Sequence, residues 1–161
     1  LSAETSVGQY PVEAVQMMGR IALEAEASGR GCPASDHARR GYPQAIAHAA
    51  CTIAGDLELK ALCAFTQSGY TARLVSKERP RTPILAFTNN PRVYNQAALY
   101  WGVTPLLVDF SGDTDALIHC VEGELLARNL ASAGDSVVIL GGMPLADKGA
   151  TNFINIHKIT G

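Results

Sequence analysis

The chain has 161 residues, of which 47% are hydrophobic and 17% are charged, and its formal net charge is −2. Such a composition excludes extended disorder, and the small charge excludes a general attraction to nucleic acid or to an anionic membrane. No apolar stretch approaches the roughly 20 residues that cross a membrane. We therefore expect a cytoplasmic chain with one folded domain, or one domain plus an appendage, in which any anion is bound by a local site.

The chain begins with Leu1 and a polar turn, without the basic segment and apolar run of a signal peptide. We therefore expect a segment of a longer protein. Its four cysteines, at positions 32, 51, 63 and 120, form no CxxC motif, which favours small buried thiols in a reducing compartment. The histidines are scattered and no HExxH motif occurs, so we expect this chain to bind no metal.

Residues 11–28 are predicted to form a helix, because Pro11 suits a first helical turn. Its apolar side chains repeat at helical spacing, at Val12, Val15, Met18 and Ala22. The following stretch, 29–36, is rich in glycine and small residues and is predicted to be a linker. Since the helix has no partner nearby in the sequence, we expect it to belong to a different domain from residues 37–161.

Beyond the linker, helices and strands are predicted to alternate. The helical patterns span 43–55, 71–77, 91–100 and 114–133, and the apolar runs of strand length span 61–66, 83–88, 104–110, 136–140 and 151–159. Continuous apolar runs between helices are typical of a parallel sheet that is covered on both faces. The last connection contains no helix, so the fifth strand should run antiparallel to the fourth. We predict an α/β three-layer sandwich around a five-stranded, mostly parallel sheet.

The segment FTQSGYTARLVS, residues 65–76, joins the first predicted strand to a helix. Ligands of doubly wound sheets bind beyond the carboxyl ends of the strands, and the free N–H groups of a helix start favour an anion. The hydroxyls of Thr66, Ser68 and Thr71 could add hydrogen bonds, and Gly69 lets the backbone approach closely. Two interpretations remain open: a phosphate-binding turn, or a plain turn in which Ser68 is the helix N-cap.

The connection GGMPLADKGATN, residues 141–152, is a second candidate at the same edge of the predicted sheet. Its glycines and Lys148 suit a lid over the first turn, with the lysine as a point charge on a phosphate. The alternative is a hairpin-type connection with a solvated lysine.

The amino-terminal stretch LSAETSVGQYPVEAVQMMGRIALEAE resembles the last loop and helix of the catalytic barrel of pyruvate kinases. Four later stretches resemble the C-terminal domain of that family in order and spacing: AIAHAACTIA, FTQSGYTARLVSKERPRTPILAFTNNP, WGVTPLL and GDSVVILGG…GATNFINIHKI. The similarity covers essentially the whole chain, and its SxETxxGxYP, TxSGx[ST]A and GxTN motifs are specific. It implies a barrel tail in residues 1–28, a linker in 29–36 and a regulatory domain of the pyruvate kinase type in 37–161.

This resemblance implies that the intact protein transfers a phosphoryl group from phosphoenolpyruvate to ADP, with Mg²⁺ and K⁺ as cofactors and as a homotetramer. In the family, the essential lysine, the metal-binding carboxylates and a catalytic threonine lie on earlier barrel loops. We therefore expect this chain alone to be inactive and to bind no cofactor. Only Ser2 and Glu4 match positions at the active-site edge, where the family's serine joins a proton relay; Val7 stands where some relatives carry a lysine.

The resemblance also implies regulation by a phosphorylated effector. The family's phosphate-binding turn matches Thr66, Gln67, Ser68, Gly69, Tyr70 and Thr71, and its effector lid matches Gly142, Lys148 and Gly149. Members that are activated by fructose 1,6-bisphosphate use a basic residue early in the long helix, whereas residues 113–127 contain no Lys or Arg. We therefore expect a sugar phosphate or nucleotide monophosphate, such as AMP, ribose 5-phosphate or glucose 6-phosphate. The alternative is a non-catalytic assembly domain for the tetramer with a vestigial effector site.

Overall fold

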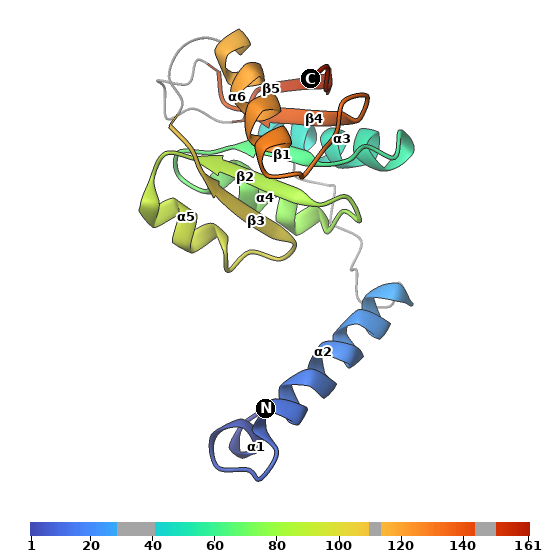
Figure 1. The fold of residues 1–161 in the computed structure, drawn as a ribbon, viewed down its shortest axis with the longest axis vertical. Coiled ribbons are helices and arrows are strands. Elements are labelled where there is room, and N and C mark those ends of the chain that lie inside the picture. Colours follow the sequence, from blue (N-terminus) through green and yellow to red (C-terminus); the bar gives the residue numbers. More distant parts are fainter. Residues whose placement is uncertain (29–40, 110–113, 144–150) are drawn as a thin grey trace. The chain divides into compact units, whose positions relative to one another are not determined.

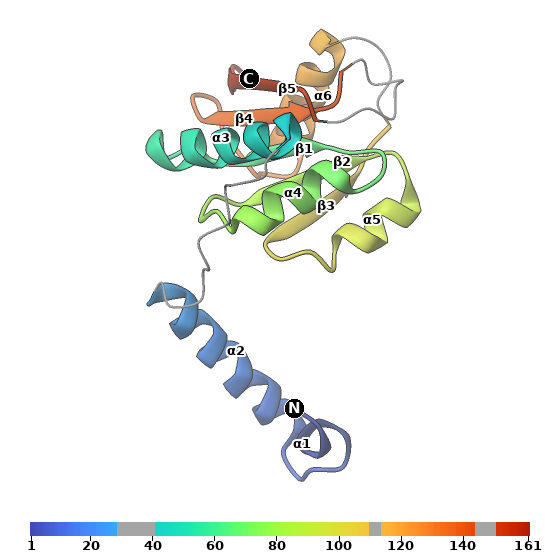
Figure 2. The ribbon, with the colours of Figure 1, turned by 180° about the vertical axis from the view of Figure 1, so that it is seen from behind.

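The computed structural model describes residues 1–28, 41–109, 114–143 and 151–161. Its contacts divide the chain into two compact units, Leu1–Ser35 and Asp36–Gly161. Both units are drawn from opposite sides in Figures 1 and 2. The boundary between the units falls within the predicted linker, while the assignment of the three segments to a barrel tail, a linker and a regulatory domain stays a prediction.

The first unit consists of two helices, α1 (Ala3–Ser6) and α2 (Pro11–Ala27). α2 begins at the predicted Pro11 and ends one residue before the predicted end, whereas α1 was not predicted. Within this unit the predicted apolar face is uncovered, since Val12 is 63% exposed and Met18 is 48% exposed. An apolar face of this kind is typical of an interaction surface.

The second unit is built around a five-stranded sheet. Its strands are β1 (Leu62–Phe65), β2 (Ile84–Thr88), β3 (Val103–Leu107), β4 (Ser136–Gly141) and β5 (Phe153–Lys158). Their spatial order is β3-β2-β1-β4-β5; β1 to β4 run parallel, and β5 runs antiparallel to β4. The prediction of a mostly parallel sheet with an antiparallel last strand is confirmed. Because Gly141 pairs with Phe153 and Ser136 with Lys158, β5 runs from the carboxyl edge of the sheet to its amino edge.

Helices cover both faces of this sheet (Figures 1 and 2). One face carries α3 (Tyr42–Asp56), α4 (Tyr70–Glu78) and α5 (Pro91–Ala97), and the other carries α6 (Thr114–Ala127). The side chains of β1 point alternately to the two faces of the sheet, which explains these layers. Leu62 and Ala64 pack with α3 and α4, while Cys63 and Phe65 pack with α6. Each strand residue is therefore buried on one face or the other, which is why the strand reads as a continuous apolar run.

The helix α6 ends at Ala127, so the prediction that it continues to residue 133 is wrong. Asn129 takes a left-handed conformation with φ 55°, and the Leu130 N–H donates to the Leu125 carbonyl oxygen at 2.9 Å. Asn is one of the few residues that adopts this conformation readily, and it ends helices in the way that glycine does. The helical spacing of apolar residues continues through Leu130, beyond the end of the helix, which is why the helix predicted from the sequence is too long.

Candidate anion-binding site

The hydroxyl-rich turn joins the carboxyl end of β1 to the start of α4. Thr66 is buried and its N–H donates to the Phe87 carbonyl oxygen at 3.0 Å, whereas Ser68 is exposed. The N-cap of α4 is Gly69, and no side chain caps the helix. The interpretation of Ser68 as the N-cap is therefore wrong. The N–H groups of the first helical turn have no intrahelical partner, and such groups favour an anion.

Gly69 is required by the shape of this turn. Its φ of 82° lies in the left-handed region, which a residue with a side chain adopts only with strain. A Cβ at this position would also lie 3.3 Å from the Tyr100 hydroxyl oxygen, which itself accepts a hydrogen bond from Gln96 Nε2 at 2.9 Å. The backbone of the turn is thereby held close to the residues that follow α5.

A pair of buried threonines joins the turn to the chain just before β5. The hydroxyl oxygens of Thr71 and Thr151 lie 2.9 Å apart, and the residues are 5% and 1% exposed. Each hydroxyl carries one proton to donate, and the bond between them uses one of the two. Neither hydroxyl makes another hydrogen bond to the described part of the chain. Within the described residues, one donor of the pair is therefore left over at the carboxyl edge of the sheet.

The two ends of the connection between β4 and β5 are held by one asparagine. Asn152 Oδ1 accepts from the Met143 N–H at 2.7 Å, and Asn152 Nδ2 donates to the Met143 carbonyl oxygen at 2.6 Å. This pair of bonds imitates an antiparallel bridge. Gly142, which directly precedes Met143 in the chain, is half-buried. The other two residues of the predicted lid, Lys148 and Gly149, lie outside the described residues, and their role stays a prediction.

The turn also has a cation nearby that the sequence analysis did not assign. The Arg73 guanidinium lies over the Tyr70 ring, 5.8 Å from its centroid, and the Tyr70 hydroxyl accepts a hydrogen bond from Gln44 Nε2 at 3.3 Å. Tyr70 is half-buried, while Gln67 and Arg73 are exposed. The spacing of three between Tyr70 and Arg73 places both on one helix face, which was the available sequence signal.

Ser2 and Glu4 interact with each other within the first unit. The Ser2 N–H donates to Glu4 Oε2 at 2.9 Å, and this hydrogen bond is the main cause that lowers the pKa of the Glu4 carboxyl. The Ser2 carbonyl oxygen accepts from the hydroxyls of Thr5 and Ser6. A Cβ at Gly8 would lie 2.5 Å from the Glu4 carbonyl oxygen, so the glycine is needed for this close approach. These contacts explain the SxETxxG pattern as a tight turn.

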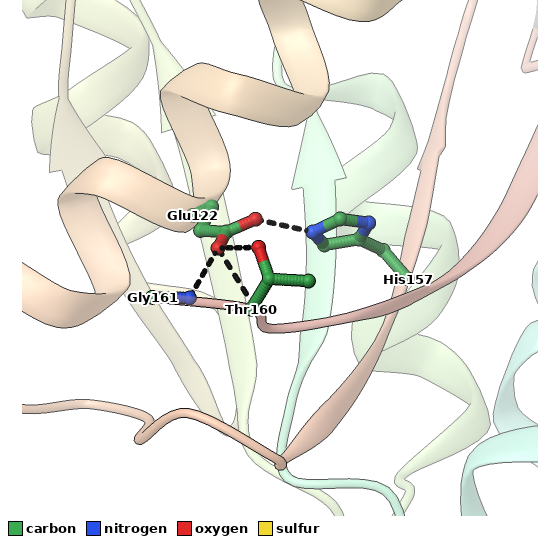
Figure 3. A network of polar contacts seen from close by, with 4 residues as sticks. All are labelled: Glu122, His157, Thr160 and Gly161. Atoms are coloured by element: carbon green, nitrogen blue, oxygen red, sulfur yellow. Dashed lines mark hydrogen bonds and ion pairs between the residues drawn. The ribbon is translucent and has the colours of Figure 1, made fainter.

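At the opposite edge of the sheet, a carboxylate holds the far end of β5 (Figure 3). Glu122 Oε1 accepts hydrogen bonds from the N–H and the hydroxyl of Thr160, both at 2.8 Å, and from the Gly161 N–H at 2.9 Å. Glu122 Oε2 lies 2.7 Å from His157 Nε2. Together these contacts lower the pKa of Glu122 to about 2, and the hydrogen bond with His157 has the largest effect. No pattern in the sequence predicts this network.

A hollow of about 440 Å³ lies at the amino edge as well, lined by Leu57, Glu58, Leu59, Lys60, Gly134, Asp135, Ser136 and Ile156. Its charged side chains are two carboxylates and one ammonium, which does not suit a phosphate. The uncapped start of α4 is therefore the better candidate for an anion site.

The described residues offer no set of metal ligands and no membrane span. No group of three or more His, Cys, Asp or Glu among them could hold a metal ion. None of the helices in these same segments is both long enough and apolar enough to cross a membrane.

The fold and the turn define an α/β domain of the doubly wound class. Residues 44–157 match the family model described as pyruvate kinase, alpha/beta domain. The chain is 41% identical over 159 residues to the pyruvate kinase of Mycobacterium tuberculosis (strain H37Rv). The aligned region covers 99% of this chain and 34% of that protein. Identity is 40% to the pyruvate kinase of Mycobacterium intracellulare and 36% to that of Clostridium acetobutylicum, with the same coverage. The chain therefore belongs to the pyruvate kinase family, as its C-terminal alpha/beta domain, and spans about a third of the length of these relatives.

Proposed function

We propose that residues 37–161 form the regulatory domain of a pyruvate kinase and bind a phosphorylated effector at the turn 66–71. The supporting observation is the uncapped start of α4 beside the Thr71–Thr151 hydroxyl pair. Backbone N–H groups and hydroxyls are the donors with which helix starts and turns bind phosphates. Gly69 brings the backbone close enough for these donors to converge.

The effector carries a single phosphate in this proposal. No Lys or Arg lies in 113–127, and Arg73 is the cation that the described residues place next to the turn. A bisphosphate would leave its second group without a matched cation in the described part of α6. The ligand class is therefore a sugar phosphate or a nucleotide monophosphate, with Gly142, Lys148 and Gly149 as the predicted lid.

The intact protein is proposed to be a glycolytic, cytoplasmic pyruvate kinase that makes pyruvate and ATP as a homotetramer, with Mg²⁺ and K⁺ bound by residues outside this chain. The exposed apolar face of α2 supports packing against a barrel. Ser2 and Glu4 are proposed to stand at the edge of its active site. The effector acts by differential affinity for two packings of the domain against the barrel or a neighbouring subunit.

Thermal unfolding of the 161-residue chain tests the effector site. A ligand at 100 times its dissociation constant adds about 2.7 kcal/mol to the free energy of unfolding. We expect AMP, ribose 5-phosphate or glucose 6-phosphate to raise the melting temperature of the wild type but not that of Ser68→Ala. Ser132→Ala, which removes another exposed serine hydroxyl, is the matched control and should respond like the wild type. No shift with any of the three at millimolar concentration contradicts the proposal.

The second candidate is an assembly module for the tetramer with a vestigial effector site. It is favoured by β5, an edge strand whose Ile156 is 51% exposed. This candidate predicts self-association in analytical ultracentrifugation together with no thermal shift by any phosphorylated ligand. A free-standing enzyme would instead form pyruvate from phosphoenolpyruvate and ADP, and we expect no such turnover from this chain.

A further inference from the structure

We infer that Thr151 is a positioning residue of the effector site, whose hydroxyl donates to Thr71 so that the Thr71 proton is free to bind phosphate. The inference rests on the proposed binding of an effector at the turn 66–71. Thr151 lies just before β5, 80 positions after Thr71, outside the turn itself.

The count of protons in the hydroxyl pair supports this arrangement. The two oxygens are 2.9 Å apart, and either one can be the donor when no ligand is bound. A phosphate accepts hydrogen bonds and donates none at its ionised oxygens, so it recruits the proton of the hydroxyl that it meets. Thr71 is in the first turn of α4, where the uncapped N–H groups favour an anion. Thr151 must then supply the proton that joins the pair.

Position separates the roles of the two threonines, because both are buried, Thr71 at 5% and Thr151 at 1% exposed. Thr71 lies in the first turn of α4, whereas Thr151 lies outside the turn 66–71, so its hydroxyl acts on a ligand through Thr71. Hydrogen bonds in a buried chain polarise one another, so donation from Thr151 makes the Thr71 hydroxyl a stronger donor. A bound phosphate therefore fixes the direction of this bond and strengthens the link between α4 and the start of β5.

Substitutions at position 151 test the inference by isothermal titration calorimetry with AMP, ribose 5-phosphate, glucose 6-phosphate and inorganic phosphate. Thr151→Val keeps the shape of the side chain and removes the hydroxyl. We expect it to weaken binding about fivefold, as the loss of one neutral hydrogen bond does. Thr151→Ser restores the hydroxyl and should bind like the wild type. If the valine variant does not fold, Thr151→Ala takes its place.

A double-mutant cycle distinguishes positioning from a general structural effect. Because Thr151 acts through Thr71, Thr151→Val should not weaken binding further in a Thr71→Val background. Ser76→Ala is the matched control. The Ser76 hydroxyl is on the same helix as Thr71, α4, but donates to the Trp101 carbonyl oxygen at 2.8 Å, away from the turn. We expect this control to lower the melting temperature and to leave the dissociation constant unchanged.

The outcomes separate this inference from the proposed function. If the wild type binds none of the four compounds, the proposed function fails and the inference fails with it. If the wild type binds and Ser68→Ala weakens binding, but Thr151→Val binds like the wild type, the inference alone is overturned. Additive losses in the double mutant overturn it too, because they show that Thr151 acts independently of Thr71.

Discussion

The two ends of β5 are fastened by different chemistry. Just before the strand begins, at the carboxyl edge of the sheet, two neutral hydroxyls share one hydrogen bond, and their second proton has no acceptor among the described residues. Just after it ends, at the amino edge, the Glu122 carboxylate receives four hydrogen bonds from His157, Thr160 and Gly161 (Figure 3). In the described part of the chain, the hydroxyl pair has one unused donor, whereas the Glu122 carboxylate accepts hydrogen bonds from the protein itself.

This difference indicates which end of β5 has the chemistry that suits a bound anion. A carboxylate that is already surrounded by donors repels another anion and has no donor to offer, so the amino-edge network is structural. The hydroxyl pair and the uncapped start of α4 offer donors without a negative charge. We therefore expect substitutions at the amino edge to change stability, and substitutions at the carboxyl edge to change ligand affinity more than stability.

Glu122→Ala should have the largest effect on stability of any single substitution in this domain that removes one of these contacts. It removes the acceptor of four hydrogen bonds at once and leaves two backbone N–H groups, a hydroxyl and the His157 ring without that acceptor. Thermal unfolding near neutral pH measures the fall in melting temperature. Glu124→Ala is the matched control on the same helix. Its partly exposed pair with Arg128, at 2.7 Å, should contribute only about 0.3–0.5 kcal/mol. Equal losses in the two variants would contradict the structural role of Glu122.

The same carboxylate predicts how stability depends on pH. The pKa of Glu122 is about 2 in the folded chain, against an ordinary 4.5. A depressed pKa means that the carboxylate stabilises the fold fully above about pH 4.5, and that this contribution is lost as the pH falls towards 2. Measured by urea unfolding, the free energies of unfolding of the wild type and Glu122→Gln should differ by a constant amount above about pH 4.5. The difference should shrink below pH 4.5, and a difference that grows there contradicts the assignment.

Gly69→Ala should cost about 1–2 kcal/mol of the free energy of unfolding, since it forces a side chain into the left-handed region. The added methyl also meets the Tyr100 hydroxyl at 3.3 Å. Gly123→Ala in α6 is a control of opposite sign: it has open space around it and should stabilise by about 0.5–1 kcal/mol. Denaturant unfolding measures both, and destabilisation by the two substitutions alike would contradict the conformational argument.

The sequence predicted those parts of the domain that depend on local pattern. Apolar runs between helical patterns predicted the layers, and the helix-free connection predicted the antiparallel β5. The composition of the turn predicted an anion site beside α4 as one of two possibilities, and that site stays a prediction. The alternative interpretation of the turn placed the N-cap at Ser68, because Ser is a common N-cap residue, whereas the N-cap is Gly69, one residue later.

Contacts between distant segments were beyond this reasoning. Thr71 and Thr151 meet because the antiparallel pairing of β4 and β5 makes β5 begin at the carboxyl edge of the sheet, the edge at which β1 leads into α4. The Glu122 network forms because the same strand ends beside α6 at the other edge. Neither pairing has a signal in residue spacing, since both depend on strand order and on the length of β5. The family motif GxTN marked Thr151 and Asn152 without stating what they contact.

Asn152→Ala should have the smallest effect of the series. It removes the two hydrogen bonds to Met143, but Asn152 is exposed and water can replace both, so we expect a loss of about 1 kcal/mol or less. Asn152→Asp should fall in between, because a carboxylate still accepts from the Met143 N–H but cannot donate to its carbonyl oxygen. Denaturant unfolding ranks these variants. A cost for Asn152→Ala as large as that for Glu122→Ala would mean that both ends of β5 are equally rigid. Substitutions near the turn would then report stability as much as ligand binding, and the contrast between the two edges would be lost.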